Sequence, residues 1–200
     1  MAYSNIRAGG LRAIDIAEGD ELISVQVTDE NSEIIIGTHN GMAIRFRADD
    51  VRPMGRTAHG VRGIRLKDGD YVVDAVTVNL ETQLMTVTEN GYGKKTAFDE
   101  YKVQSRGGQG VFNYKLTQKT GNVVGMKAVS DNDDIMMITS DGIIIRTHTA
   151  EISTYSRHTQ GVRVMKLADG TSLVGIALTA HEDETDNIEE NANTEELSNE

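Results

Sequence analysis

Four glycines at near-equal spacing constrain this chain more than any other feature of its sequence. Gly10, Gly60, Gly110 and Gly161 are separated by about 50 residues, and an apolar residue follows each of them. A fixed period of this length indicates stacked supersecondary units, because one unit cannot bury its apolar face alone. The repeat therefore predicts the fold class, and the residues carried on the repeat predict the function.

Short strands separated by tight turns fill each unit. Within residues 61–110 we expect strands at 61–66, 71–78, 83–88 and 93–98. The turn sequences Asp68-Gly69 and Asn90-Gly91 supply the positive φ that tight hairpins need. Strands at matching places are expected in the other units, at 21–27, 33–38, 42–46, 122–129, 134–139 and 143–147. The chain is therefore predicted to be an all-β, propeller-like array of four-stranded blades.

The repeat also sets the expected division of the chain. Its parts are the end of a preceding blade (1–10), three whole blades (11–60, 61–110 and 111–161), a half blade (162–180) and a disordered acidic tail (181–200). About three and a half blades are too few to close a propeller, which typically has four to eight. We therefore expect a piece of a longer protein, and a short open array is the alternative.

The net charge of −11 is concentrated at one end of the chain. Nine acidic residues and no Lys or Arg lie in residues 181–200, so the rest carries only about −2. A segment this polar and this poor in apolar residues is predicted to be disordered. The absence of Cys excludes disulfides and thiolate metal sites and fits a reducing compartment. Neither a membrane span nor a signal peptide is expected from the sequence.

Lysines and arginines recur at equivalent positions in successive units. One set lies four residues after a turn glycine, a second lies in the loop before each repeat glycine, and a third lies just after it. The predicted DNA-binding residues are Arg45, Arg56, Arg62, Arg65, Lys95, Arg106, Lys115, Arg146, Arg157, Arg163 and Lys166. A periodic row of cations fits the periodic phosphates of a nucleic acid, with little reading of bases. The alternative is an ordinary solvated strand face, where charged residues alternate with apolar ones.

No constellation of residues indicates catalysis. The five histidines (His39, His59, His148, His158 and His181) show no metal-ligand spacing, and we expect no metal site and no cofactor. Neither a nucleophile elbow nor a phosphate-binding P-loop occurs. The chain alone is therefore not expected to be an enzyme.

The loop Gln104-Ser105-Arg106-Gly107-Gly108-Gln109-Gly110 resembles the gyrase A box, whose pattern is Gln-Arg-Arg-Gly-Gly-Lys-Gly. Ser105 and Gln109 replace an arginine and a lysine of that pattern, so this copy is degenerate. The segments 140–146 and 157–163 also resemble blades of the gyrase A family, and the resemblance covers about residues 2–180.

The resemblance implies a β-pinwheel, the C-terminal domain of the A subunits of type IIA topoisomerases, which binds, bends and wraps duplex DNA. It implies as partners duplex DNA, the ATPase (B) subunit, and the rest of the A subunit, in the bacterial cytoplasm at the nucleoid. Six blades and a full box in the first blade are usual in gyrase, so this chain resembles about the last half of that domain. The parent would be an ATP-dependent isomerase, but its catalytic tyrosine follows an arginine, and no tyrosine here does.

Three alternatives remain at the level of sequence. The first is the equivalent domain of topoisomerase IV, which usually lacks a faithful box and bends DNA less. The second is a propeller-like scaffold for protein interactions. The third concerns the tail alone, which either competes with DNA as an intramolecular anion or only keeps the chain dispersed in water.

Overall fold

The computed structural model describes residues 8–181, and within them nearly all regular structure is β. The strands are β1 (Glu33–Thr38), β2 (Met42–Arg47), β3 (Val72–Thr77), β4 (Gln83–Thr88), β5 (Tyr92–Ala97), β6 (Val111–Phe112), β7 (Val123–Val129), β8 (Asp133–Thr139), β9 (Ile144–His148), β10 (Val162–Arg163) and β11 (Leu173–Ala180). Single 3₁₀ turns follow β2, β5 and β9, at Ala48–Asp50 (η1), Phe98–Glu100 (η2) and Thr149–Glu151 (η3). The described residues contain no helix with the length and apolar character needed to cross a membrane.

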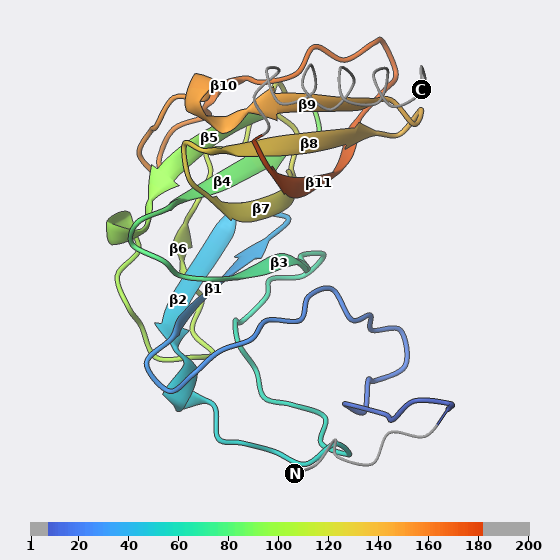
Figure 1. The fold of residues 1–200 in the computed structure, drawn as a ribbon, viewed down its shortest axis with the longest axis vertical. Coiled ribbons are helices and arrows are strands. Elements are labelled where there is room, and N and C mark those ends of the chain that lie inside the picture. The colour runs from blue at the N-terminus through green and yellow to red at the C-terminus, as the bar shows by residue number, and fades with distance from the viewer. Residues whose placement is uncertain (1–7, 182–200) are drawn as a thin grey trace, which may run out of the picture.

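The strands form three antiparallel sheets that follow one another along the long axis of the molecule (Figure 1). The first sheet has the order β3-β1-β2-β6, the second β7-β4-β5-β10 and the third β11-β8-β9. The centre of each sheet is a local hairpin, β1–β2, β4–β5 or β8–β9. This arrangement confirms the predicted all-β array of four-stranded blades, with the third sheet one strand short in the described part of the chain.

The sheets do not coincide with the predicted units. The first sheet takes β1 and β2 from residues 11–60, β3 from residues 61–110 and β6 from residues 111–161. The second sheet combines strands of successive units in the same way. The prediction that each unit forms its own blade is therefore wrong. A period in the sequence gives the length of a repeat but not the point at which one sheet ends and the next begins.

Two predicted strands are absent from the described residues, at 21–27 and at 61–66. Neither segment pairs as a strand with any of the three sheets, and Val25 and Val27 are largely exposed. The matching segment 111–116 forms only β6, the short strand that pairs with Met42 and Ala43 of β2. A strand-like sequence pattern was therefore insufficient to predict a strand at these places, because a strand also needs a hydrogen-bonding neighbour.

The second sheet is covered on both faces, which fixes the stacking of the array. Leu84 belongs to a core shared with Ile35 of the first sheet, and its neighbour Met85 belongs to a core shared with Ile135 of the third. Successive residues of a strand point to opposite faces, so adjacent apolar residues on β4 serve two cores. Burial on both sides explains why this strand is a continuous apolar and threonine run.

Candidate nucleic-acid interface

Two of the three bases that follow the turn glycines, Arg45 and Lys95, are buried inside the fold rather than presented to solvent. Arg45 on β2 is only 8% exposed, and its Nε donates to Oε2 of Glu33 at 2.6 Å. Its Nη1 donates to the carbonyl oxygens of Phe98 at 2.8 Å and Tyr101 at 3.2 Å. Arg45 therefore anchors the η2 turn of the second sheet to the first sheet.

The equivalent bases in the next two sheets are also ion-paired. Lys95 is 3% exposed, and its Nζ lies 2.5 Å from Oδ1 of Asp131. Arg146 is more open, and its Nε donates to Oδ2 of Asp134 at 2.6 Å. Arg45 and Lys95 are therefore buried side chains engaged within the fold, and a phosphate contact by Arg45 would leave the carbonyls of Phe98 and Tyr101 without their donor.

The loop that resembles the gyrase A box packs against residues 62–65. Gly107 donates its backbone N–H to the carbonyl of Gly63 at 2.7 Å, and Gly108 accepts from the N–H of Arg65 at 2.8 Å. Gln104 donates from its backbone N–H to the carbonyl of Arg45 at 2.8 Å. Gly107 and Gly110 both adopt positive φ, which explains two of the glycines in the loop. The remaining members, Ser105 and Gln109, are exposed.

Two loop arginines bind the backbone of the neighbouring segment. Arg106 donates through Nη1 to the carbonyl of Arg62 at 2.5 Å, and Arg157 donates likewise to the carbonyl of Phe112 at 2.8 Å. Glu100 accepts from the backbone N–H of Arg157 at 3.0 Å. These half-buried guanidinium groups therefore hold their loops in place, and only part of each is open to a ligand.

Lys94 holds the loop 156–159 from inside the fold. Its side chain is fully buried, and its Nζ donates to the carbonyls of Ser156 and Arg157, each at 2.8 Å, and of Thr159 at 3.1 Å. The ammonium also lies 4.8 Å from the ring centre of Tyr114. Burial lowers the pKa of Lys94 to about 8, although the carboxylate of Glu100 acts in the opposite direction. Sequence reasoning missed this residue because the equivalent positions of the other units, Ile44 and Ile145, are apolar.

A second group of bases is exposed and has no carboxylate partner in the described part of the chain. These bases lie on the segments that follow the repeat glycines. They are Arg62, Arg65, Lys115, Arg163 and Lys166. Arg163 donates to the hydroxyl of Tyr92 at 3.1 Å and lies over that ring. Arg56 is half-buried and likewise forms no ion pair within residues 8–181.

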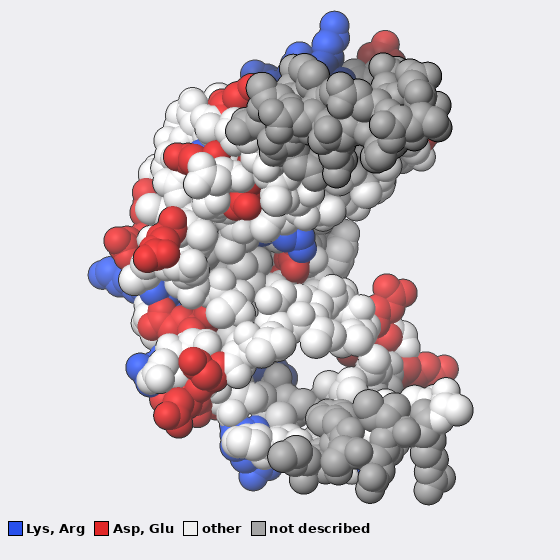
Figure 2. Space-filling model, viewed as in Figure 1, with Lys and Arg blue, Asp and Glu red and all other residues white. Residues whose placement is uncertain are grey.

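These segments run along the edges of successive sheets. Residues 111–116 and 162–166 continue from β6 and β10, the outer strands of the first and second sheets (Figure 1). Figure 2 shows Lys and Arg along the left margin and at both ends of the view, with Asp and Glu between them. Lys115, Arg163 and Lys166 thus lie on or just after edge strands, whereas Arg62 and Arg65 lie on a segment outside the sheets, and the viewed face as a whole is not uniformly basic.

An exposed aromatic residue interrupts the row of bases. Phe112 on β6 is 58% exposed and occupies the place that Arg163 occupies on β10. Its ring centre lies 6.4 Å from that of His158, beside a shallow pocket that Lys115 and Leu116 also line. Sequence reasoning missed Phe112. The signal that could have found it is an aromatic residue at a position where another unit has the basic residue Arg163.

The fold and this edge define a class of protein, the propeller-like repeat domain built from stacked four-stranded sheets. The sequence profile of the family described as "DNA gyrase C-terminal domain, beta-propeller" matches residues 2–29, 32–79, 82–130 and 133–180. The chain therefore belongs to this family. The last three matched repeats each begin at, or one residue before, the first strand of a central hairpin, in agreement with the sheets.

Relatives in sequence agree with this assignment. The chain is 57% identical over 195 residues to the DNA gyrase A protein of Halalkalibacterium halodurans, covering 98% of this chain and 23% of that protein. Over 178 residues it is 44% identical to the DNA gyrase A protein of Salmonella typhimurium, covering 89% of this chain and 20% of that protein. The chain thus spans less than a quarter of the length of these curated relatives.

Two solved structures share the fold. The DNA gyrase A C-terminal domain superposes with a TM-score of 0.77 at 31% identity, covering 84% of this chain and 57% of that chain. The C-terminal domain of DNA topoisomerase IV gives a TM-score of 0.84 at 25% identity, covering 100% of this chain and 62% of that chain. The chain is accordingly a topoisomerase C-terminal domain.

Proposed function

We propose that this chain binds, bends and wraps duplex DNA without sequence preference, as part of a gyrase-type A subunit. In this role it supports ATP-dependent negative supercoiling by the parent topoisomerase and takes no part in cleavage chemistry itself. Its partners are then the ATPase (B) subunit, together with the rest of the A subunit, in the cytoplasm at the bacterial nucleoid.

The pairing pattern of the bases is the observation that carries this proposal. Structural bases such as Arg45 and Lys95 have carboxylate partners, whereas Arg65, Lys115 and Lys166 are exposed and have none among the described residues. Unpaired cations at matching places on successive sheets suit a ligand with regularly spaced negative charges. Phosphate contacts of this kind release counterions and give salt-dependent, sequence-independent binding.

Bending follows from the arrangement of the sheets if DNA contacts more than one of them. Lys115 follows the edge strand of the first sheet and Lys166 follows that of the second, so a duplex that touches both must follow the array. The cost of bending a short duplex is a few kcal/mol and is offset by the additional phosphate contacts. Deformable sequences should therefore bind slightly more tightly than stiff ones.

A titration of duplex DNA at several salt concentrations tests the binding proposal. We expect a linear fall of the logarithm of affinity with the logarithm of salt concentration, with a slope that reflects several phosphates. Fluorescence transfer between the ends of a duplex of about 40 base pairs should increase on binding if the duplex bends. An affinity that does not change with salt contradicts the proposal and favours a scaffold for protein interactions.

The topoisomerase IV domain remains a second candidate, because its C-terminal domain superposes over the whole chain. The sequence relatives favour gyrase. Resealing a nicked plasmid in the presence of the chain distinguishes the two. Wrapping changes the linking number of the sealed plasmid, whereas simple bending in one plane leaves it unchanged.

A further inference from the structure

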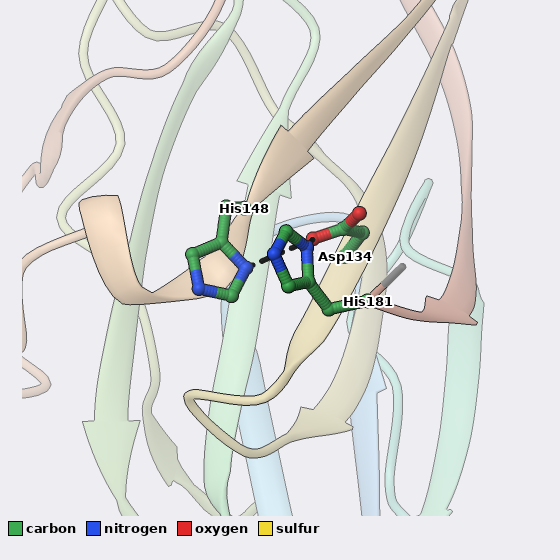
Figure 3. A group of neighbouring side chains, drawn as sticks. All are labelled: Asp134, His148 and His181. Atoms are coloured by element: carbon green, nitrogen blue, oxygen red, sulfur yellow. Dashed lines mark hydrogen bonds and ion pairs between the residues drawn. The ribbon is translucent and has the colours of Figure 1, made fainter. Parts of the chain in front are cut away.

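Two histidines and one buried aspartate meet at one end of the strands of the third sheet (Figure 3). Oδ1 of Asp134 lies 2.9 Å from Nδ1 of His148 and 2.8 Å from Nδ1 of His181. The two imidazole ring centres are 4.0 Å apart. One atom from each side chain, two nitrogens and one oxygen, therefore faces a common point, and these atoms lie within 4.8 Å of one another.

Asp134 and His148 lie on neighbouring strands, and His181 directly follows a third. Asp134 lies on β8 directly opposite His148, the last residue of β9. On the other side of β8, Ala180 at the end of β11 lies opposite Asp133. The backbone N–H of His181 then donates to the carbonyl of Asn132 at 3.3 Å, which continues the alignment by one residue. The geometry of the cluster is thus a product of strand register.

The first sheet shows that the histidines are not needed to balance the acidic residue. There Glu33 occupies the register position of Asp134, pairs with Arg45 and lies opposite Arg47. In the second sheet the corresponding pair is Gln83 and Ala97. The ion pair between the acidic residue and the following arginine recurs in the third sheet as Asp134–Arg146. The two imidazoles are an addition specific to the third sheet.

The donor set suits a transition metal of intermediate softness. Imidazole nitrogens bind Zn²⁺, Ni²⁺, Co²⁺ and Cu²⁺, and a carboxylate oxygen completes three-ligand sites that leave a position for water. Asp134 is buried, whereas both imidazoles are partly exposed, so an ion has access from solvent. Burial raises the pKa of Asp134, but hydrogen bonds from His148, His181 and Arg146 lower it to about 2, so the carboxylate is ionised. Arg146 binds Oδ2 and thereby orients Oδ1 toward the histidines.

We propose that the third sheet binds one Zn²⁺ ion or a similar divalent transition-metal ion through Nδ1 of His148, Nδ1 of His181 and Oδ1 of Asp134. The ion would replace the two imidazole–carboxylate hydrogen bonds and join β8, β9 and the end of β11. Its effect would be to fix the last described strand, which forms an edge of the array. Sequence spacing gave no sign of this site, because Asp134 is 14 positions from His148 and 47 from His181.

Calorimetric titration of the metal-free 200-residue chain with ZnCl₂ tests the site. We expect one ion per chain and a rise in Tm of about 5–10 °C when free Zn²⁺ is a hundredfold above its Kd. His148→Gln and His181→Gln should each weaken binding by about tenfold or more. His158→Gln is the matched control, because this exposed loop histidine lies beside Phe112 of the first sheet, outside the cluster, and should leave the affinity unchanged.

A second measurement keeps the test independent of variant folding. In nitrogen-15 histidine spectra of the unaltered chain, Zn²⁺ should shift the Nδ1 signals of two histidines and leave the other three unchanged. Absence of stoichiometric binding, equal weakening by His158→Gln, or shifts spread over all five histidines would show adventitious binding only and overturn the proposal. DNA binding is not a readout here, so failure of the metal site leaves the proposed function untouched.

Discussion

The carbonyl oxygen of Ala43 occupies the place where a side chain on Gly110 would begin. Gly110 precedes β6, and this close approach lets Val111 pair with Ala43 at the edge of β2. Gly161 meets the carbonyl of Gly93 in the same manner before β10. Gly60 has positive φ but only a distant contact, Cδ1 of Ile14 at 3.9 Å. Gly110 and Gly161 thus mark points where the chain comes close to the backbone of a sheet edge. Gly10 and Gly60 make no such close backbone contact.

Replacing these glycines by alanine should separate backbone strain from overlap. Gly60→Ala should cost about 1 kcal/mol of unfolding free energy, because alanine disfavours positive φ. Gly110→Ala should cost about 3 kcal/mol or more, because the backbone of Ala43 must also move away from the new methyl group. Urea denaturation of both variants measures the difference. Equal costs would show that Gly110 is not closely packed against Ala43 in solution.

Arg45→Gln should destabilise the fold far more than it weakens DNA binding. The change leaves the carboxylate of Glu33 and the carbonyls of Phe98 and Tyr101 without their donor. We expect a loss of about 3 kcal/mol in unfolding free energy, as for other broken buried ion pairs. Binding of duplex DNA at a temperature where the variant is folded should change little. A variant of native stability with a large loss of DNA affinity would contradict the assignment of Arg45 as structural.

The exposed bases should behave in the opposite way. The double variant Lys115→Gln/Lys166→Gln should retain its stability to within about 0.5 kcal/mol, because neither side chain forms an ion pair among the described residues. Its binding of duplex DNA should weaken for all sequences alike, and the salt dependence should lose about one unit of slope per residue. Glu18→Gln/Glu30→Gln, which alters two exposed acidic residues, is a control for changed charge. An unchanged slope in the lysine variant would remove these residues from the interface.

Lys94 should make the stability of the fold depend on pH. Its pKa is about 8 in the folded chain, below the ordinary value of 10.5. The folded state therefore loses this proton first, so the contribution of Lys94 to the unfolding free energy rises as pH increases from about 8 to 10.5. Between pH 7.5 and 9.5 the wild type should gain about 2 kcal/mol relative to Lys94→Met. Lys115→Met serves as the control for loss of an exposed lysine, and parallel curves for all three chains would contradict the buried ammonium.

Tyr101→Phe should lower the stability of the fold by disturbing the core between the first two sheets. The hydroxyl of Tyr101 donates to Oδ1 of Asn113, and both residues are fully buried. Removing it leaves the amide oxygen of Asn113 without that donor, at a cost of about 1–3 kcal/mol. Tyr71→Phe alters an exposed tyrosine and should be nearly neutral. Thermal unfolding followed by circular dichroism compares the two, and similar Tm values would show that Asn113 finds another donor.

The sequence by itself determined the period, the central hairpins and the family. Turns such as Asn90-Gly91 and short strand-forming runs such as 83–88 are local, and the structure confirms the hairpin that they predict. The loop 104–110 likewise carried its resemblance in adjacent residues. The interface was harder to predict from the sequence. Basic residues at equivalent positions of the repeat were assumed to have equivalent surroundings, but some of them are buried and others are exposed. The predictions for the acidic tail lie outside the described residues.

Only the tertiary structure decided which units share a sheet and which bases reach solvent. Arg45 and Lys115 are both basic residues of the repeat, yet packing of the next sheet buries the first and leaves the second exposed. The cluster of Asp134, His148 and His181 also depends on pairing between three strands distant in sequence. Local patterns specify turns and strand faces, but long-range pairing sets register, and register determines which side chains meet.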